Sequence, residues 1–234
     1  MKSSAKRRFL AQVARFPQLI AWGPVRHSQG YLVPYYFNFR AAPSLPKLRE
    51  HVVRALVREV RRLRVDVVVG AETAGMAWAA LVADRLGKPF AYVRKKRKPA
   101  LDRRAVEGIY RAGTRAVLID DTVLLGETKK SMVREALRDG LEVTHVLLIY
   151  GGTPRQATWR KLTLWLRQRG VRLTMLVTKD ELSRAFTERG IITPELIELN
   201  ALYMADPYGW HKTRSARRLL PQLKQARSRY APTR

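Results

Sequence analysis

The sequence predicts an α/β protein in which a mostly parallel sheet is covered by helices on both faces. The main observation is that short β-branched runs alternate with amphipathic helical patterns from residue 44 to residue 204. The second is size, because 234 residues with 46% apolar side chains are enough to bury a substantial core. The third is the absence of cysteine, which excludes disulfides, thiolate metal sites and a cysteine nucleophile.

The elements follow one another in the order expected of a Rossmann-like sheet. A short basic helix is expected at residues 5–15, and loops with short strands at 16–43, a segment rich in aromatic residues. Ser44 is the expected N-cap of a helix that runs to about Arg64 and repeats apolar residues at helical spacing. The remaining pattern predicts strands at 66–70, 89–93, 115–119, 142–150 and 171–177, and helices at 74–86, 128–138, 154–169, 179–188 and 193–204.

We predict one domain at residues 1–206, of which about 1–43 form an N-terminal segment, followed by a basic C-terminal extension at 207–234. The extension carries Leu219, Leu220 and Leu223 at helical spacing beside lysine and arginine residues. An amphipathic helix is therefore expected there, with its leucines against the domain and its charges outward.

The chain is strongly basic, with 46 Lys and Arg against 19 Asp and Glu, a formal charge of +27. The first acidic residue is Glu50, and no acidic residue follows Asp206. This excess predicts attraction to polyanions, and the two acid-free ends are the candidate surfaces for non-specific binding of RNA or DNA. Solubility is the competing interpretation, in which the C-terminal tail is merely solvated or packs on a partner subunit.

The sequence favours a cytoplasmic protein without a membrane span. No apolar run approaches the roughly 18 residues that a transmembrane helix needs. The arginine-rich start is also typical of an organellar transit peptide, but it is not distinctive in a chain that is basic throughout. Four scattered histidines leave little for a histidine metal cluster.

The most informative stretch is residues 115–128, an apolar run that ends in Asp120 and Asp121 and continues through Gly126 into an amphipathic helix. Parallel sheets bind ligands at the carboxyl edge, where these two acids are expected to lie. The helix N-terminus that follows has free N–H groups that suit a phosphate. Acids beside a phosphate cradle suggest a sugar phosphate. The alternative, about equally favoured by the pattern alone, is that the acids only end the strand and enter a turn.

This segment resembles the signature for phosphoribosyl pyrophosphate in type I phosphoribosyltransferases, and the chain is similar to the orotate phosphoribosyltransferases among them. Further stretches resemble that family in the same order: the aromatic segment 34–40, the pyrophosphate loop 69–77, the strand 86–95 before the mobile loop, and the C-terminal segment 206–210. The resemblance covers roughly residues 16–210 and implies the type I phosphoribosyltransferase fold, with an N-terminal hood segment.

The resemblance also implies a role for each matching residue. Asp120 and Asp121 would hold ribose hydroxyls near a Mg²⁺ ion that binds through the substrate rather than directly to the protein. Lys98 would cover the pyrophosphate leaving group from the neighbouring subunit, which implies a homodimer. Tyr36 and Phe37 would contact the base. The residues expected to bind phosphoribosyl pyrophosphate are Thr73, Gly75, Arg94, Lys95, Asp120, Asp121, Gly126 and Thr128.

The chain departs from the family pattern at Ala100 in the mobile loop, at Leu124, Leu125 and Glu127 in the phosphate loop, and at Gly151 near the base. Two functions are therefore expected as alternatives. The first is phosphoribosyl transfer to a pyrimidine-type base, with release of pyrophosphate. The second is a catalytically weakened protein of the same fold that senses nucleotides or binds RNA or DNA.

Overall fold

The computed structural model describes residues 3–26, 30–95, 97, 104–123, 126–152 and 156–230. The chain divides into two compact units. Unit 1 comprises Met1–Phe9 and Pro43–Thr178, and unit 2 comprises Leu10–Ala42 and Lys179–Arg234. The structure thus groups the C-terminal residues from Lys179 onward with an N-terminal segment, whereas the sequence predicted a boundary near residue 206.

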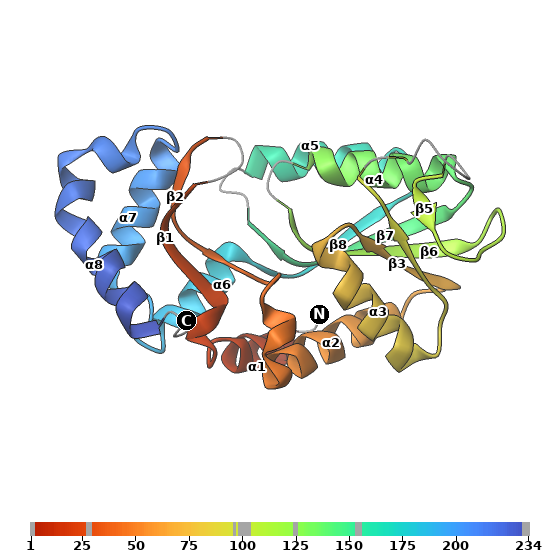
Figure 1. Ribbon diagram of the computed structural model, residues 1–234, viewed down its shortest axis with the longest axis horizontal. Coiled ribbons are helices and arrows are strands. Elements are labelled where there is room, and N and C mark those ends of the chain that lie inside the picture. The colour runs from red at the N-terminus through yellow and green to blue at the C-terminus, as the bar shows by residue number, and fades with distance from the viewer. Residues whose placement is uncertain are drawn as a thin grey trace. The chain divides into compact units, whose positions relative to one another are not determined.

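Unit 1 is built on a six-stranded sheet with the strand order β5-β4-β3-β6-β7-β8 (Figure 1). Adjacent strands are parallel except β4 and β5, which are antiparallel. This confirms the predicted mostly parallel α/β sheet and adds β5, a strand of two residues that hydrophobic patterning cannot detect. The strands are β3 (Val67–Ala71), β4 (Phe90–Val93), β5 (Val106–Glu107), β6 (Arg115–Val123), β7 (Glu142–Gly151) and β8 (Arg172–Thr178).

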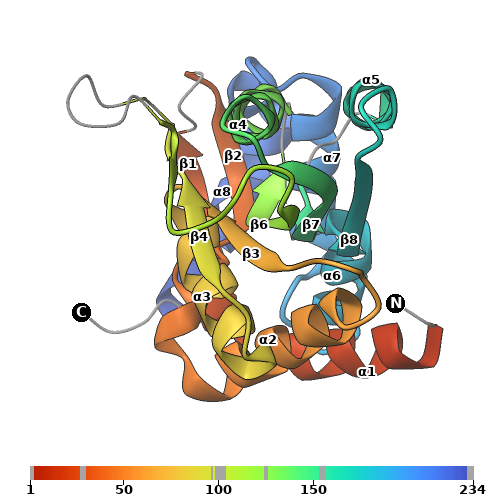
Figure 2. The same ribbon diagram turned by 90° about the vertical axis from the view of Figure 1, so that its right-hand side faces the viewer.

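Helices cover both faces of this sheet, as Figures 1 and 2 show. One face is covered by α2 (Pro46–Val60) and α3 (Ala74–Leu86), and the other by α4 (Glu127–Arg138) and α5 (Gln156–Arg167). β3 is a continuous apolar run because both of its faces are covered, and every residue of β3 is buried.

The predicted N-cap of the first of these helices was wrong. Ser44 lies in a 3₁₀ turn, Ala42–Ser44, and the N-cap of α2 is Leu45, which makes no side-chain capping hydrogen bond. Pro46 occupies the first helical position, where its fixed φ angle and missing N–H are compatible with a helix. The proline therefore determines where this helix begins.

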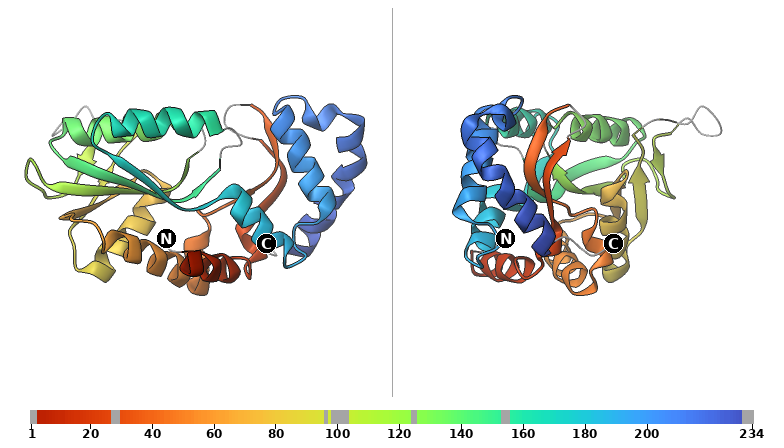
Figure 3. Two further views of the ribbon diagram at one scale, coloured as in Figure 1. Left: turned by 180° about the vertical axis from the view of Figure 1, so that it is seen from behind. Right: turned by 60° about the vertical axis from the view of Figure 1, so that its left-hand side comes forward.

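Unit 2 contains an antiparallel pair of strands, β1 (Ile20–Arg26) and β2 (Leu32–Phe37), and three helices, α6 (Lys179–Thr187), α7 (Pro194–Ala205) and α8 (Arg214–Tyr230). Short 3₁₀ turns lie at Pro17–Leu19 and Trp210–Lys212, and α1 (Ser3–Val13) contains the boundary with unit 1. α8 packs on α7 and β1, and α7 packs on β2 (Figure 3).

The basic extension is therefore a packed helix. Leu219 and Leu223 of α8 are buried, while Arg217 and Lys224 are exposed, as the helical spacing predicted. Trp22 of β1 stacks on Tyr230 at the end of α8, with ring centroids 6.1 Å apart. Within the described parts of the chain, no helix is both long enough and apolar enough to cross a membrane.

A buried lysine lies in the core of unit 2. Lys179 Nζ donates a hydrogen bond to Asn200 Oδ1 at 2.8 Å and lies over the rings of Tyr35 and Tyr203, 5.3 and 5.4 Å from their centroids. Burial lowers the pKa of Lys179 to about 8, and the nearby carboxylate of Asp180 opposes this shift only in part.

Candidate active site

The candidate site lies where the order of the sheet reverses. β3 connects through α3 to β4 on one side, whereas β6 connects through α4 to β7 on the other side. The crevice outside the carboxyl ends of β3 and β6 is therefore the point at which such sheets bind ligands. Gly70 of β3 pairs with Ile119 of β6 and with Tyr92 of β4. The loops that follow these three strands consequently emerge beside one another.

Gly75 brings the start of α3 directly against Ile119 and Asp120 of β6. A Cβ atom at this position would clash with the carbonyl oxygen of Ile119 and lie 3.1 Å from Cα of Asp120. Gly70 shows a similar close approach, because a Cβ there would lie 2.7 Å from Cα of Met76. Both glycines are needed for close packing between strand and helix, and their φ angles are not in the left-handed region. The predicted pyrophosphate loop and the acidic pair are thus neighbours.

The acidic pair is buried and ordered by an ion pair. Asp120 and Asp121 are 3% and 5% exposed. Asp120 Oδ1 accepts a hydrogen bond from the backbone N–H of Asp121 at 2.8 Å, and its Oδ2 accepts one from Nζ of Lys129. Asp121 Oδ1 accepts a hydrogen bond from the backbone N–H of Thr122 at 2.7 Å. Asp120 is therefore the anchored acid, with a buried lysine as its counter-ion.

The phosphate loop leads into α4 through Gly126, a buried residue with φ +89° that is the N-cap of the helix. Thr128 is exposed in the first turn. Glu127 is also exposed, and its carboxylate pairs with Lys130 at 2.7 Å, so its charge is compensated on the helix surface. Leu124 and Leu125 lie outside the described residues.

Two cations follow β4 at the same edge of the sheet. Arg94 donates from Nη1 to Glu107 at 2.9 Å, and its buried Nε has no hydrogen-bond partner within the described residues. Lys95 is exposed, and its backbone N–H donates to Glu72 Oε2 at 2.6 Å, which ties the loop after β4 to the loop after β3. The donors that the resemblance assigns to pyrophosphate therefore flank the crevice.

The segment that the resemblance assigns to the catalytic loop follows these residues. Arg97 pairs with Glu135 and, at 2.8 Å, with Asp139, both near the end of α4. Lys98 and Ala100 lie outside the described residues, so the predicted catalytic role of Lys98 stays a prediction. Gly151 is described and ends β7, where it pairs with Thr178.

The two residues expected to contact a base lie on β2 in unit 2. Phe37 is 1% exposed, and its ring packs against Phe186 with centroids 5.3 Å apart. Tyr36 is half-buried and pairs with Ala21 in the β1–β2 ladder. Phe37 therefore packs in the core of unit 2, and base contact by these residues stays a prediction.

The donor set does not form a protein-only metal cage. Among the residues that the structure describes, no group of three or more His, Asp or Glu side chains is placed to hold a metal ion. Oxygen ligands suit Mg²⁺, but Asp120 already has a cationic partner. The residues present are compatible with a Mg²⁺ ion only if the ion takes most of its ligands from a bound phosphate compound and from water.

Two features of the site were missed from the sequence. Lys129 had no assigned role, although it falls three and four residues before Met132 and Val133, which are buried on the inner face of α4. A lysine at helical spacing with apolar residues signals a buried ion pair. Glu72 was also missed, because only the strand pairing reveals its contact with Lys95.

Comparison with known proteins identifies the family of the chain. No protein-family model matches the chain. An orotate phosphoribosyltransferase of Dinoroseobacter shibae is 30% identical over 191 residues, which cover 79% of this chain and 82% of the relative. The solved orotate phosphoribosyltransferase of Aeropyrum pernix is 26% identical with a TM-score of 0.61, over 77% of this chain and 99% of that one.

A third protein shares the fold. The orotate phosphoribosyltransferase of Mycobacterium tuberculosis, solved in complex with phosphoribosyl pyrophosphate, has a TM-score of 0.59 at 20% identity, over 74% of this chain and 98% of that one. The match in sequence and fold extends over most of the chain, as the resemblance over residues 16–210 predicted. The chain belongs to the orotate phosphoribosyltransferase family, within the type I phosphoribosyltransferases, which are glycosyltransferases.

Proposed function

We propose that this protein transfers the phosphoribosyl group of phosphoribosyl pyrophosphate to orotate. In this reaction the bond from ribose C1′ to pyrophosphate breaks, a bond from C1′ to a ring nitrogen of orotate forms, and the proton of that nitrogen is released to pyrophosphate or solvent. The observation that carries the proposal is the contact of Gly75 with Asp120 at the switch point of the sheet, which joins a pyrophosphate loop to an acidic pair.

The proposal assigns different tasks to the two acids. Asp120 is anchored by Lys129 and by the backbone of Asp121, so it orders the loop. Asp121 then accepts hydrogen bonds from the ribose hydroxyls, as the family resemblance implies. The N-terminus of α4, with Thr128, supplies donors for the 5′-phosphate. Arg94 and Lys95 stabilise the charge that develops on pyrophosphate.

Mg²⁺ is part of the proposal as an ion carried by the substrate. It neutralises charge on pyrophosphate and so makes it a better leaving group. The support is the carboxylate of Asp121 at the candidate site. The described residues offer no group of three or more protein ligands, so the ion would take most of its ligands from the substrate and from water. Turnover should therefore require Mg²⁺ at concentrations that bind the substrate, and chelation should leave the folded protein intact.

The direct experiment measures pyrophosphate release from phosphoribosyl pyrophosphate with orotate, uracil, adenine or hypoxanthine as acceptor. We expect release with orotate and at least a hundredfold less with the other bases. Asp121→Asn should abolish release, whereas Asp84→Asn, which changes an exposed acid on α3, should not. The proposal is refuted if none of the four bases supports pyrophosphate release. Binding of the donor without release, in a folded protein, would instead favour the weakened, nucleotide-sensing alternative.

A homodimer is the assembly that the proposal requires, because the resemblance gives each site a Lys98 from the neighbouring subunit. Lys98→Ala and Asp121→Asn should each inactivate the enzyme when alone. Subunits of the two variants, mixed at random, should recover about a quarter of wild-type activity, since half of the dimers then hold one intact site. No recovery, with dimers observed by light scattering, would place Lys98 in its own subunit's site.

A further inference from the structure

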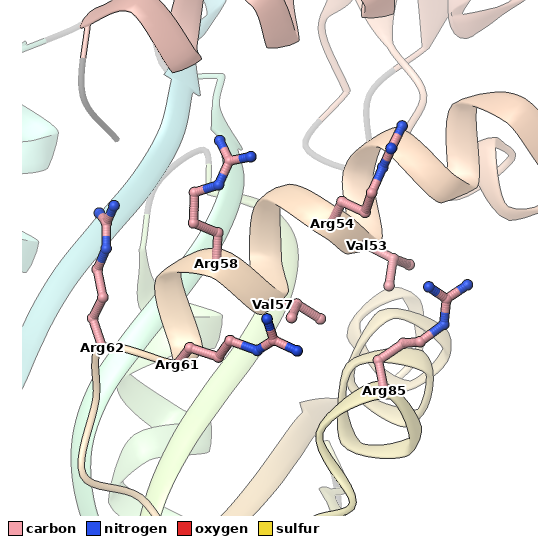
Figure 4. A pocket seen from close by; sticks show the side chains of 7 residues that line it. All are labelled: Val53, Arg54, Val57, Arg58, Arg61, Arg62 and Arg85. Carbon is pink, nitrogen blue, oxygen red and sulfur yellow. The ribbon is translucent and has the colours of Figure 1, made fainter.

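A groove between α2 and α3 concentrates positive charge away from the candidate active site. It has a volume of about 440 Å³ and is lined by Val53 and Val57 and by five arginines, Arg54, Arg58, Arg61, Arg62 and Arg85. In Figure 4 the side chain of Arg61 extends from the end of α2 toward Arg85 on α3, past Val57. Arg85 lies ten residues after Gly75, or about 15 Å farther along the helix axis.

The arginines of the groove are only partly neutralised by acids. Glu50 pairs with Arg85 at 2.7 Å and with Arg54 at 3.5 Å. Glu59 pairs with Arg62 at 3.2 Å.

Arg58 and Arg61 are exposed, and neither has an ion-pair partner among the residues that the structure describes. Five guanidinium groups therefore face two carboxylates, which leaves three positive charges uncompensated within a few turns of helix. Like charges held this close repel one another and favour a bound anion.

The kind of anion follows from the geometry. Guanidinium groups bind phosphate oxygens in a forked, bidentate way, so several of them around one space suit a ligand with several phosphates. A volume of 440 Å³ is typical of a small-molecule site. Glu50 and Glu59 lie on α2 with Arg54 and Arg58, so acids alternate with the basic residues there. A compact anion therefore fits this groove better than an extended nucleic-acid strand, which needs a continuous cationic track.

We propose that the α2–α3 groove binds a short polyphosphate chain, either inorganic or carried by a nucleoside. This site is separate from the loops that would hold phosphoribosyl pyrophosphate, and it does not depend on the transfer reaction. Val53 and Val57 line the groove but are only 3% and 8% exposed, so recognition would rest on the phosphate groups.

Calorimetric titration of the full chain with inorganic tripolyphosphate tests the proposal. Arg58→Gln/Arg61→Gln should weaken binding by tenfold or more, because each charge-assisted bond contributes roughly that factor. Arg58→Lys/Arg61→Lys should retain part of the affinity. The matched control is Arg111→Gln/Arg167→Gln, which removes two exposed arginines elsewhere in unit 1 and should change affinity less than twofold. Pyrophosphate release from phosphoribosyl pyrophosphate should be the same in the wild type and in these three double variants.

A parallel titration with uridine triphosphate tests whether the bound polyphosphate is inorganic or carried by a nucleoside. Tighter binding than tripolyphosphate supports a nucleoside ligand, and equal binding supports an inorganic one. The proposal is overturned if the double Gln variant binds like the control pair, or if affinity falls only in Asp121→Asn, which would place the anion in the active site. It is also overturned if the double Gln variant changes only the oligomeric state, since the groove would then join two copies of the chain.

Discussion

The buried ion pair between Lys129 and Asp120 makes a sharp prediction about stability. Lys129→Met should lower the free energy of unfolding, because the Asp120 carboxylate then stays buried without its cation. Breaking a buried pair from one side costs about 3–5 kcal/mol. Asp120 keeps the hydrogen bond from the backbone N–H of Asp121, so we expect the lower end, about 3 kcal/mol.

Lys130→Met is the matched control, since it removes the next lysine on the same helix. Its partner, Glu127, has 75% of its side chain exposed, so this change should cost less than about 1 kcal/mol. The double variant Lys129→Met/Asp120→Asn removes both charges and should recover about 2 kcal/mol relative to the sum of the single changes.

Urea unfolding at pH 7 and fixed salt, followed by circular dichroism and tryptophan fluorescence, gives these free energies. Two results would refute the reasoning. One is a cost for Lys129→Met no greater than for Lys130→Met, which would mean that the pair is exposed to water. The other is additivity of the Lys129 and Asp120 changes within about 0.5 kcal/mol, which would mean that the two side chains do not interact.

Three other parts of the molecule give predictions of their own. Gly75→Ala should destabilise the protein by about 1–3 kcal/mol and reduce turnover, because the new Cβ meets the backbone at Ile119; unchanged melting would contradict this contact. Burial lowers the pKa of Lys179 to about 8, against 10.5 for an unperturbed lysine. Below pH 8 the buried charge therefore lowers the free energy of unfolding. This loss of stability disappears as the pH rises from 8 to 10.5, because the folded protein releases the proton first. Lys179→Met should therefore raise the free energy of unfolding at pH 7 by up to about 3 kcal/mol and remove the rise above pH 8, as measured by urea titrations across that range. If the exposed face of α8 binds RNA, Arg217→Gln/Lys224→Gln should reduce the slope of log affinity against log salt by about one to two. An unchanged slope would mean that these two charges are only solvated.

Local patterns in the sequence were enough to predict most of the sheet. The predicted helix at 74–86 coincides with α3, and the predicted strand at 142–150 differs from β7 by one residue. These elements were predictable because both are long and mostly apolar, as a central strand and a helix packed on a buried sheet must be. The strand predicted at 115–119 is β6, but it continues to Val123, so Asp120 and Asp121 lie within the strand and do not end it.

Features that depend on distant contacts could not be predicted in this way. The packing of α8 on β1 joins segments nearly two hundred residues apart, and no local pattern in the extension indicates its partner. The Lys129–Asp120 pair spans only nine residues, but it depends on how the phosphate loop turns α4 back onto β6. Pairing across a turn is a property of the folded backbone, which residue spacing by itself does not determine.

The distribution of the acidic residues indicates which cations the fold holds in place. With 46 basic and 19 acidic residues, most cations have no acid to pair with. Around the candidate site, Glu107 and Asp120 are each paired with a cation, so Arg94 and Lys129 are fixed in position before a substrate arrives. Preorganised charge of this kind is what stabilises a transition state, because no reorganisation is needed during the reaction. Arg58 and Arg61 of the α2–α3 groove have no such acid among the described residues, so an anion bound there would reduce their mutual repulsion, and its binding should stabilise the protein against unfolding.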